Sequence, residues 1–105
     1  MKRTVYIISG PAGIGKSTVA AKLANSMENC AYISGDDLLD MHVSGWELPW
    51  KSEREVKLIW DNILALTRNF LDVGDVVIDY VTFPSRLTWI KETLNEYDVL
   101  INYVL

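Results

Sequence analysis

Runs of β-branched and aromatic residues alternate along the chain with stretches whose apolar residues recur every three or four positions. Runs of the first kind are typical of buried strands, and the second spacing is that of an amphipathic helix. The predicted strands cover residues 4–9, 31–34, 76–79 and 98–105. The predicted helices extend from Val19 to Met27, from Ser52 towards Gly74, and from Pro84 to Leu94.

The long central helix has sequence signals at both of its ends. Ser52 and Glu55 have the spacing of a capping box, in which the serine hydroxyl accepts from the backbone N–H of Glu55 and the glutamate reaches back to the serine. At the other end, Gly74 predicts a residue in the left-handed conformation that stops a helix. We therefore expect one long helix between these two points.

Strands that alternate with helices predict an α/β protein, with a parallel sheet, right-handed crossovers and helices on both faces. The first and third strands are almost continuously apolar, which is typical of central strands that are covered on both sides. In such sheets, ligands bind beyond the carboxyl ends of the strands. Candidate functional residues are therefore expected where each strand ends.

Composition narrows the choice of partners. A chain of 105 residues, half of them apolar, fits a single domain over residues 1–105. Its net charge of −4 argues against nucleic acid and anionic membranes as partners, since both are bound by clustered lysines and arginines. No apolar stretch is long enough to span a membrane. The single cysteine, Cys30, cannot form an internal disulfide, which favours a cytoplasmic location.

The segment between the first strand and the first helix fits the pattern G-x-x-x-x-G-K-S/T. Glycines in this pattern turn the backbone so that its N–H groups surround a phosphate at the start of the helix. Lys16 is expected to reach the β- and γ-phosphates, and the hydroxyl of Ser17 is expected to bind the Mg²⁺ that bridges them. The predicted nucleotide-binding residues are Gly10, Pro11, Ala12, Gly13, Ile14, Gly15, Lys16, Ser17 and Thr18.

Carboxylates follow the second and third predicted strands. Asp79 ends an apolar strand, which is the Walker B pattern, and its carboxylate is predicted to bind Mg²⁺ together with Ser17. Asp36 and Asp37 follow the second strand directly. A different interpretation stays open for these two aspartates, because aspartate is common where a turn or helix begins and they could cap the residues after them.

An irregular segment over residues 38–51 is a candidate substrate-facing loop, because bulky apolar residues are mixed there with turn-forming ones. Its tryptophans, Trp46 and Trp50, could either cover an acceptor site or fasten the loop.

Three further residues of the predicted helices carry competing interpretations. Arg86, near the end of the third strand, could meet a phosphate or an acceptor, and a solvated position at a helix start is an equal alternative. Trp60 and Trp89 lie on helical apolar stripes, where core packing is the favoured role.

With the glycine loop, the turn at 34–37 and the strand end at 77–79 in this order, the chain resembles the small-molecule P-loop kinases. It is most similar to the gluconate-kinase-like and shikimate-kinase-like proteins of the adenylate kinase superfold, over essentially its whole length. The resemblance implies a three-layer P-loop NTPase fold with about four parallel strands in the order 2-3-1-4. It also implies that Lys16, Asp36 and Asp79 are catalytic, and that Asp36 contacts the acceptor hydroxyl with Asp37 as its substitute.

The resemblance predicts an enzyme that uses ATP and Mg²⁺ to transfer the γ-phosphoryl group to a hydroxyl of a small metabolite, such as a gluconate-like sugar acid. The predicted substrate-binding residues are Asp36, Asp37, Trp46 and Arg86. The alternative hypothesis is a non-catalytic nucleotide-binding or dimerising remnant of such a kinase. A GTPase is disfavoured because the sequence has no N-K-x-D motif, whereas a toxin-like kinase acting on a nucleotide sugar stays open.

Kinases of this kind continue beyond the fourth strand with a lid that carries arginines, whereas this sequence stops at Leu105. Slow turnover is therefore expected, because a closing lid excludes water and its arginines neutralise developing charge. An apolar strand at a sheet edge also predicts a homodimer that forms through the C-terminal strand.

Overall fold

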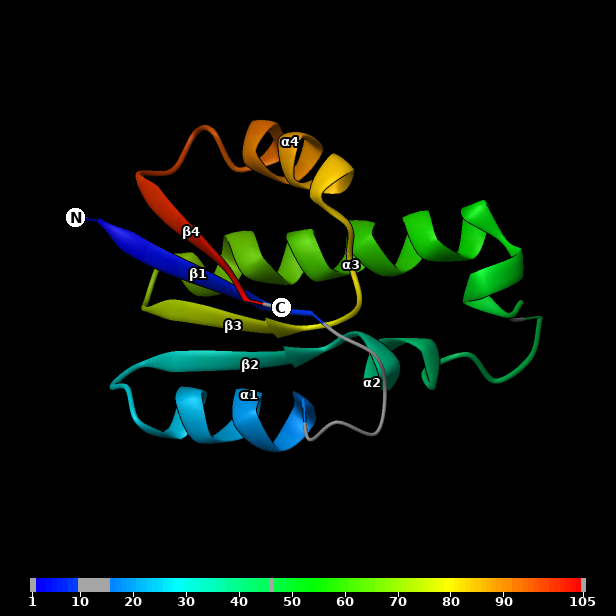
Figure 1. Cartoon of the computed structure of the whole chain (residues 1–105), viewed down its shortest axis with the longest axis horizontal. Coiled ribbons are helices and arrows are strands. Elements are labelled where there is room, and N and C mark those ends of the chain that lie inside the picture. The colour runs from blue at the N-terminus through cyan, green and yellow to red at the C-terminus, as the bar shows by residue number, and fades with distance from the viewer. Residues whose placement is uncertain (1, 10–15, 46, 105) are drawn as a thin grey trace.

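Strands and helices alternate along the chain in the order that the sequence predicts (Figure 1). The computed structural model describes residues 2–9, 16–45 and 47–104. Every predicted strand and helix is present, and a short helix and a 3₁₀ turn are added on either side of the irregular segment. In chain order the elements are β1 (Arg3–Ile8), α1 (Lys16–Asn25), β2 (Cys30–Ser34), α2 (Gly35–Leu39), η1 (Pro49–Lys51), α3 (Glu53–Leu71), β3 (Asp75–Asp79), α4 (Pro84–Thr93) and β4 (Val99–Val104).

The four strands form one parallel sheet in the order β2-β3-β1-β4, which confirms the predicted order. The register aligns the carboxyl ends of three strands. Asp79 of β3 is paired with Ile8 of β1 on one side and with Ser34 of β2 on the other. Residues that follow these three positions are therefore brought to one edge of the sheet.

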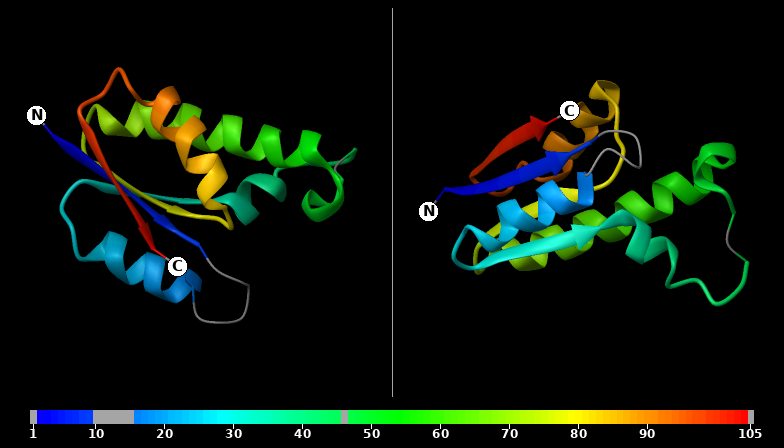
Figure 2. Two further views of the ribbon diagram at one scale, coloured as in Figure 1. Left: turned by 45° about the horizontal axis from the view of Figure 1, so that its top comes forward. Right: turned by 60° about the horizontal axis from the view of Figure 1, so that its bottom comes forward.

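Helices cover both faces of the sheet, so that the fold has three layers. The turned views in Figure 2 show α1 on one face and α3 with α4 on the other. Because successive residues of a strand point to opposite faces, Val77 packs towards α1 whereas Val76 and Ile78 belong to the larger core under α3 and α4. Among the residues that the structure describes, no helix combines the length and the apolar character that crossing a membrane requires.

The buried face of α1 differs from the predicted one. The apolar pattern puts Val19 on one face with Ala20, Leu23, Ala24 and Met27, but Val19 is 54% exposed whereas Ala20 is fully buried. The buried stripe continues through Leu23 and Ala24, three and four residues after Ala20, and these pack in the smaller core. Val19 precedes Ala20 by about 100° of helical rotation and so lies outside this stripe.

Gly74 is required for a reason that the sequence did not show. The predicted left-handed stop is wrong, because the positive-φ residues in the described part of the chain are Asn29, at 52°, and Gly45, at 78°. Asp72, the cap of α3, has the right-handed conformation. A Cβ at Gly74 would overlap the carbonyl oxygen of Asn29. Glycine therefore lets the turn after α3 approach the turn between α1 and β2.

Candidate functional site

Polar side chains from three elements meet at the carboxyl edge of the sheet. The Tyr32 hydroxyl, on β2, donates to Oδ2 of Asp79 at the end of β3 with an oxygen–oxygen distance of 2.6 Å. The Ser17 side chain, in the first turn of α1, lies close enough to the Tyr32 hydroxyl to favour a lower Tyr32 pKa. These three residues, Ser17, Tyr32 and Asp79, form a polar triad. The structure therefore brings together the two residues that were predicted to bind Mg²⁺.

Tyr32 keeps its proton within the triad. Burial, followed by the hydrogen bond to Asp79 and the charge of that carboxylate, raises the pKa of Tyr32 to about 12, against an opposing hydrogen bond from Ser17. The phenol therefore remains a donor at neutral pH. Because it holds Oδ2 of Asp79, it fixes the direction in which this 2% exposed carboxylate points.

The triad fits the needs of a magnesium ion that is bound mainly through phosphates. Mg²⁺ prefers hard oxygen ligands and commonly takes one or two from protein, with water and phosphate oxygens completing its shell. Ser17 and Asp79 supply such oxygens, and both lie close to the hydroxyl of Tyr32. Within the described ranges, no group of three or more His, Cys, Asp or Glu side chains could hold a metal by itself. The donor set therefore suits Mg²⁺ that arrives with a nucleotide.

The glycine loop itself lies outside the described residues. This holds for Gly10, Pro11, Ala12, Gly13, Ile14 and Gly15, and equally for Trp46 in the irregular segment. Lys16 is the first residue of α1, and Ser17 and Thr18 are exposed in its first turn. The start of α1 thus lies at the carboxyl edge of the sheet, as the phosphate-loop pattern requires.

The two aspartates that follow β2 lie in the first turn of α2. Ser34 caps this helix by accepting a hydrogen bond from the backbone N–H of Asp37, so neither aspartate is the cap. After burial, the charge of Asp36 raises the pKa of Tyr80, whereas the charge of Asp37 contributes to the raised pKa of Tyr32. Asp36 therefore lies near Tyr80, and Asp37 lies near Tyr32 of the polar triad.

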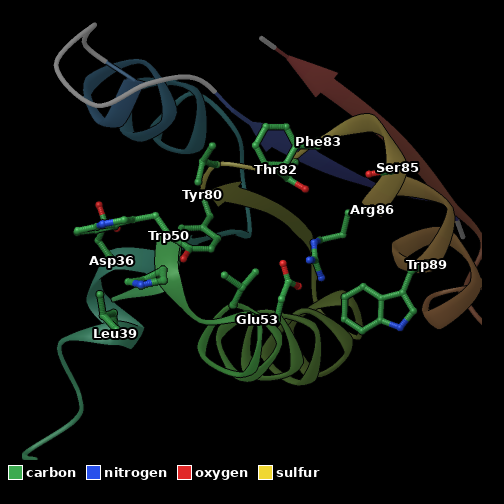
Figure 3. Close-up of a pocket in the computed structure, with 13 residues that line it drawn as sticks. Asp36, Leu39, Trp50, Glu53, Tyr80, Thr82, Phe83, Ser85, Arg86 and Trp89 are labelled. Carbon is green, nitrogen blue, oxygen red and sulfur yellow. The ribbon is translucent and has the colours of Figure 1, made fainter. Parts of the chain in front are cut away.

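A large cavity of about 890 Å³ opens on the Asp36 side (Figure 3). Its walls come from α2, η1, the start of α3, the β3–α4 loop and α4. The lining residues are Asp36, Leu39, Pro49, Trp50, Glu53, Val56, Tyr80, Val81, Thr82, Phe83, Ser85, Arg86 and Trp89. This large cavity contains Asp36 and Arg86 of the predicted substrate-binding residues, and Asp37 is not among its lining residues.

Glycine at the start of α2 allows Asp36 to reach the cavity. A Cβ at Gly35 would overlap the ring of Tyr80, which lies at the cavity wall. The Tyr80 ring packs in turn against Trp60, with ring centroids 6.1 Å apart. Trp60 is fully buried, which confirms its predicted role in the core.

Opposite Asp36, the cavity carries a pair of charged residues beside an indole ring. Figure 3 shows the Glu53 and Arg86 side chains directed into the cavity from α3 and α4. In the part of the chain that the structure describes, neither of them forms an ion pair. The Arg86 guanidinium lies 5.8 Å from the centroid of the Trp89 ring, within the range of a cation–π contact. Trp89 is only half-buried, so the predicted role in core packing describes it incompletely.

The loop after β3 is fastened to the strand that precedes the glycine loop. Ser9 Oγ donates to the carbonyl oxygen of Thr82 and accepts from the Thr82 backbone N–H, both at 3.0 Å. The Tyr103 hydroxyl, on β4, donates to the same carbonyl at 2.8 Å. The wall that carries Thr82 is therefore held in place by β1 and β4.

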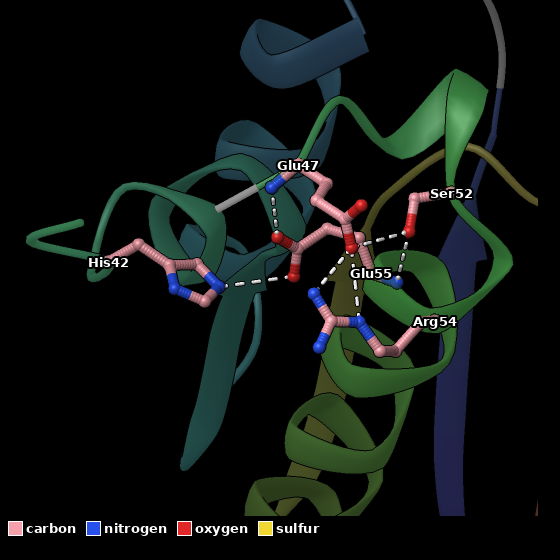
Figure 4. A network of polar contacts seen from close by, with 5 residues as sticks. All are labelled: His42, Glu47, Ser52, Arg54 and Glu55. Carbon is pink, nitrogen blue, oxygen red and sulfur yellow. Dashed lines mark hydrogen bonds and ion pairs between the residues drawn. The ribbon is translucent and has the colours of Figure 1, made fainter. Parts of the chain in front are cut away.

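The wall formed by η1 is fastened by a buried glutamate (Figure 4). Glu55 is 3% exposed, accepts from the backbone N–H of Glu47 at 2.8 Å and contacts Nε2 of His42 at 3.1 Å. Its own backbone N–H donates to Ser52 Oγ at 3.1 Å. Half of the predicted capping box is thus confirmed, but the Glu55 carboxylate bonds Glu47 instead of reaching back to Ser52. The hydrogen bond from Glu47 is the main reason why the pKa of Glu55 is lowered.

Sequence reasoning missed Tyr32 and Glu53 as site residues. Tyr32 lies in the middle of a predicted strand, and Glu53 in a predicted first helical turn where acidic residues are common. Tyr32 could have been found by its position two residues before the strand end, on the same face as Ser34. Glu53 had no such signal, because its place in the cavity depends on how α3 packs against α4.

The sheet order, the helices on both faces and the glycine pattern between β1 and α1 together define the three-layer P-loop NTPase fold. No protein-family model and no curated protein sequence matches the chain.

Solved structures with this fold are similar to the chain over nearly all of its length. A hexameric APS kinase from Thiobacillus denitrificans matches with a TM-score of 0.64 and 18% identity, over 99% of this chain and 22% of that one. A chain of the Pnkp1/Rnl/Hen1 complex matches with a TM-score of 0.64 and 22% identity, over 98% and 35%. A tunicamycin resistance protein from Deinococcus radiodurans matches with a TM-score of 0.57 and 17% identity, over 98% and 61%. The chain therefore shares their fold and spans about a fifth to three fifths of their length.

Proposed function

We propose that this chain binds ATP with Mg²⁺ and transfers the γ-phosphoryl group to a hydroxyl of a small molecule held in the large cavity. The observation that carries the proposal is the position of α2. Asp36 lines the cavity and the charge of Asp37 acts on Tyr32 of the polar triad, which supports a metal–phosphate site beside a cavity for a second molecule. Phosphoryl transfer depends on holding two reactants in line, and such an arrangement suits it.

Each residue has a defined part in the proposed reaction. The backbone of the glycine loop and Lys16 hold the phosphates, and Ser17 and Asp79 hold Mg²⁺. The magnesium ion, when bound, neutralises charge on the phosphates. The oxygen of the acceptor hydroxyl attacks the γ-phosphorus while Asp36 accepts the proton of that hydroxyl, and ADP leaves.

The gluconate-like acceptor, membership of the gluconate-kinase-like family and a cytoplasmic location stay predictions. The second candidate function is a nucleotide-binding module without turnover that pairs through β4. It is supported by the exposure of Leu100, 48%, on the β4 edge of the sheet. Transfer of a labelled γ-phosphate to any acceptor distinguishes the enzyme from the binding module.

Calorimetric titration with Mg²⁺-ATP tests the proposal. Lys16→Ala is expected to weaken ATP affinity by at least about tenfold, because a charge-assisted contact with the phosphates is lost. Lys22→Ala is the matched control, since Lys22 is an exposed lysine in the last turn of the same helix. Equal ATP affinities in Lys16→Ala and the parent chain would show that the glycine loop is not a phosphate site.

A further inference from the structure

We propose that the acceptor is an uncharged alcohol attached to a planar ring that carries neighbouring hydrogen-bond donor and acceptor atoms, and not a sugar acid. The inference rests on the proposed function and names the class of molecule that the large cavity would take. It is carried by the composition of the cavity wall, by the pair Glu53 and Arg86, and by the position of Asp36.

The wall of the cavity is mainly apolar and aromatic. Eight of its thirteen residues are of this kind, namely Leu39, Pro49, Trp50, Val56, Tyr80, Val81, Phe83 and Trp89. Trp50 is 75% exposed and Phe83 is 68% exposed, so that large aromatic surfaces are available to a ligand. A ring that stacks on them removes apolar area from water, whereas the hydroxyl groups of a sugar acid would lose hydration without gaining partners there.

The charges of the cavity also disfavour an acid. Its charged lining residues are Asp36, Glu53 and Arg86, which sum to a charge of −1. A carboxylate ligand would meet two carboxylates for one guanidinium. Glu53 accepts hydrogen bonds and Arg86 donates them, and neither is engaged in an ion pair within the described ranges. The edge of a planar ring with adjacent donor and acceptor atoms satisfies both groups at once.

The two ends of the cavity match the two ends of such a molecule. Figure 3 shows Asp36 on one side of the cavity and Arg86 with Trp89 on the other. A ring bound beside Trp89 and Arg86 leaves its alcohol substituent directed towards Asp36, next to the polar triad. Glu53, Arg86 and Trp89 also border a second hollow of about 500 Å³, which provides room for a substituent on the far edge of the ring.

Uridine and gluconate are the probes that test the inference. Uridine combines an uncharged ring edge of donors and acceptors with a primary alcohol, and gluconate has the alcohol without the ring. Each is titrated into the parent chain in the presence of Mg²⁺ and a saturating non-hydrolysable ATP analogue, which keeps uridine out of the nucleotide site. The other common ribonucleosides are titrated in the same way, with calorimetry and tryptophan fluorescence as readouts.

At least one ribonucleoside is expected to bind about tenfold or more tightly than gluconate, because stacking of a base on an aromatic side chain contributes on that scale. Trp50→Ala and Trp89→Leu are expected to weaken that binding by about five- to tenfold while the affinity for the ATP analogue is unchanged. Trp50 is an exposed residue of a short turn, so its variant is not expected to disturb folding. Lys91→Ala, on the exposed face of α4, is the matched control.

The outcomes separate this inference from the proposed function. Gluconate binding as tight as that of the best ribonucleoside, or a bound ATP analogue without any ribonucleoside binding, overturns the inference alone. Absence of ATP binding together with ribonucleoside binding that depends on Trp50 overturns the proposed function and supports the ring-binding cavity. Binding of neither class of ligand overturns both.

Discussion

The polar triad and the large cavity both lie near α2 and are built in different ways. Ser17, Tyr32 and Asp79 are polar and come from the start of α1, from β2 and from the end of β3, and Tyr32 donates a hydrogen bond to Asp79. The cavity is mainly apolar, and its walls come from helices and loops that approach from several directions. Its charged pair, Glu53 and Arg86, comes from the first turns of two different helices.

This difference indicates how one fold can keep a reaction and vary its acceptor. The relative positions of β2 and β3 are set by backbone pairing, which leaves little freedom in the distance between Tyr32 and Asp79. The cavity depends on side-chain size and on the packing of α3 and α4, which substitutions can change without disturbing the sheet. Substitutions in the polar triad and substitutions in the large cavity should therefore have separable effects on ATP binding and on phosphoryl transfer.

The largest separable effect is expected from Asp36→Asn. This change should lower the rate of phosphoryl transfer by about 10²- to 10⁴-fold, because the hydroxyl proton loses its acceptor, with little change in the affinity for Mg²⁺-ATP. A coupled turnover assay and calorimetry on the same preparations measure the two quantities. Asp40→Asn, the exposed aspartate at the end of α2, is the matched control and should retain transfer. A parallel loss of ATP affinity in Asp36→Asn would remove the functional distinction between the polar triad and the large cavity.

Asp79→Asn should show the opposite pattern. The change removes a negative oxygen from the predicted Mg²⁺ site, so the gain in ATP affinity that Mg²⁺ provides should fall by about tenfold or more. Calorimetric titration with ATP, in Mg²⁺ and in excess chelator, gives this gain directly. Binding of ATP in chelator should be similar in the variant and the parent. An undiminished effect of Mg²⁺ would show that Asp79 does not bind the ion.

A smaller effect on the same side is expected from Tyr32→Phe. The variant keeps the ring but removes the donor that holds Oδ2 of Asp79, and loss of such a supporting hydrogen bond weakens metal affinity by about tenfold. The Mg²⁺ dependence of ATP binding is the measurement, and Tyr6→Phe on β1 is a control for removal of a phenol hydroxyl. If Tyr32→Phe bound Mg²⁺-ATP as tightly as the parent, the tyrosine would have no part in orienting the carboxylate.

The last and smallest effect concerns pH and the cavity wall. Glu55 has a pKa below its ordinary value of 4.5, chiefly because of the hydrogen bond from Glu47. Its contribution to stability is therefore fully present above pH 4.5 and is lost as the pH falls through the lowered pKa. Thermal unfolding should show a Tm difference between the parent and Glu55→Gln that is largest near neutral pH and narrows in acid.

Glu53→Gln provides the control for that experiment, since Glu53 is an exposed glutamate of the same helical turn. Its Tm should differ little from that of the parent across the same pH range. A Tm difference for Glu55→Gln that does not change with pH would mean that its ionisation does not fasten the η1 wall.

Much of the fold and one side of the site followed from local sequence. The apolar runs predicted all four strands, and the carboxyl ends of those strands predicted where Ser17, Asp36 and Asp79 would lie. Gly74 was predicted as a left-handed helix stop, and this was wrong. Glycine is needed at position 74 because the backbone of Asn29, far away in the sequence, lies too close for a side chain. Val19 was misplaced because two adjacent positions can both fit an apolar stripe until the helix packs on its sheet.

The sequence by itself determined the α/β class and the phosphate-loop pattern, because periodicity and short motifs depend on neighbouring residues, whereas the strand order followed from the resemblance to P-loop kinases. Only the tertiary structure decided that Asp36 and not Asp37 lines the large cavity, and that Tyr32 joins the pair expected to bind Mg²⁺. Only the tertiary structure placed Glu53 beside Arg86 and Trp89. These positions depend on how separate strands and helices pack together, as in the contact between Tyr32 and Asp79, 47 positions apart, and no local pattern predicts such contacts.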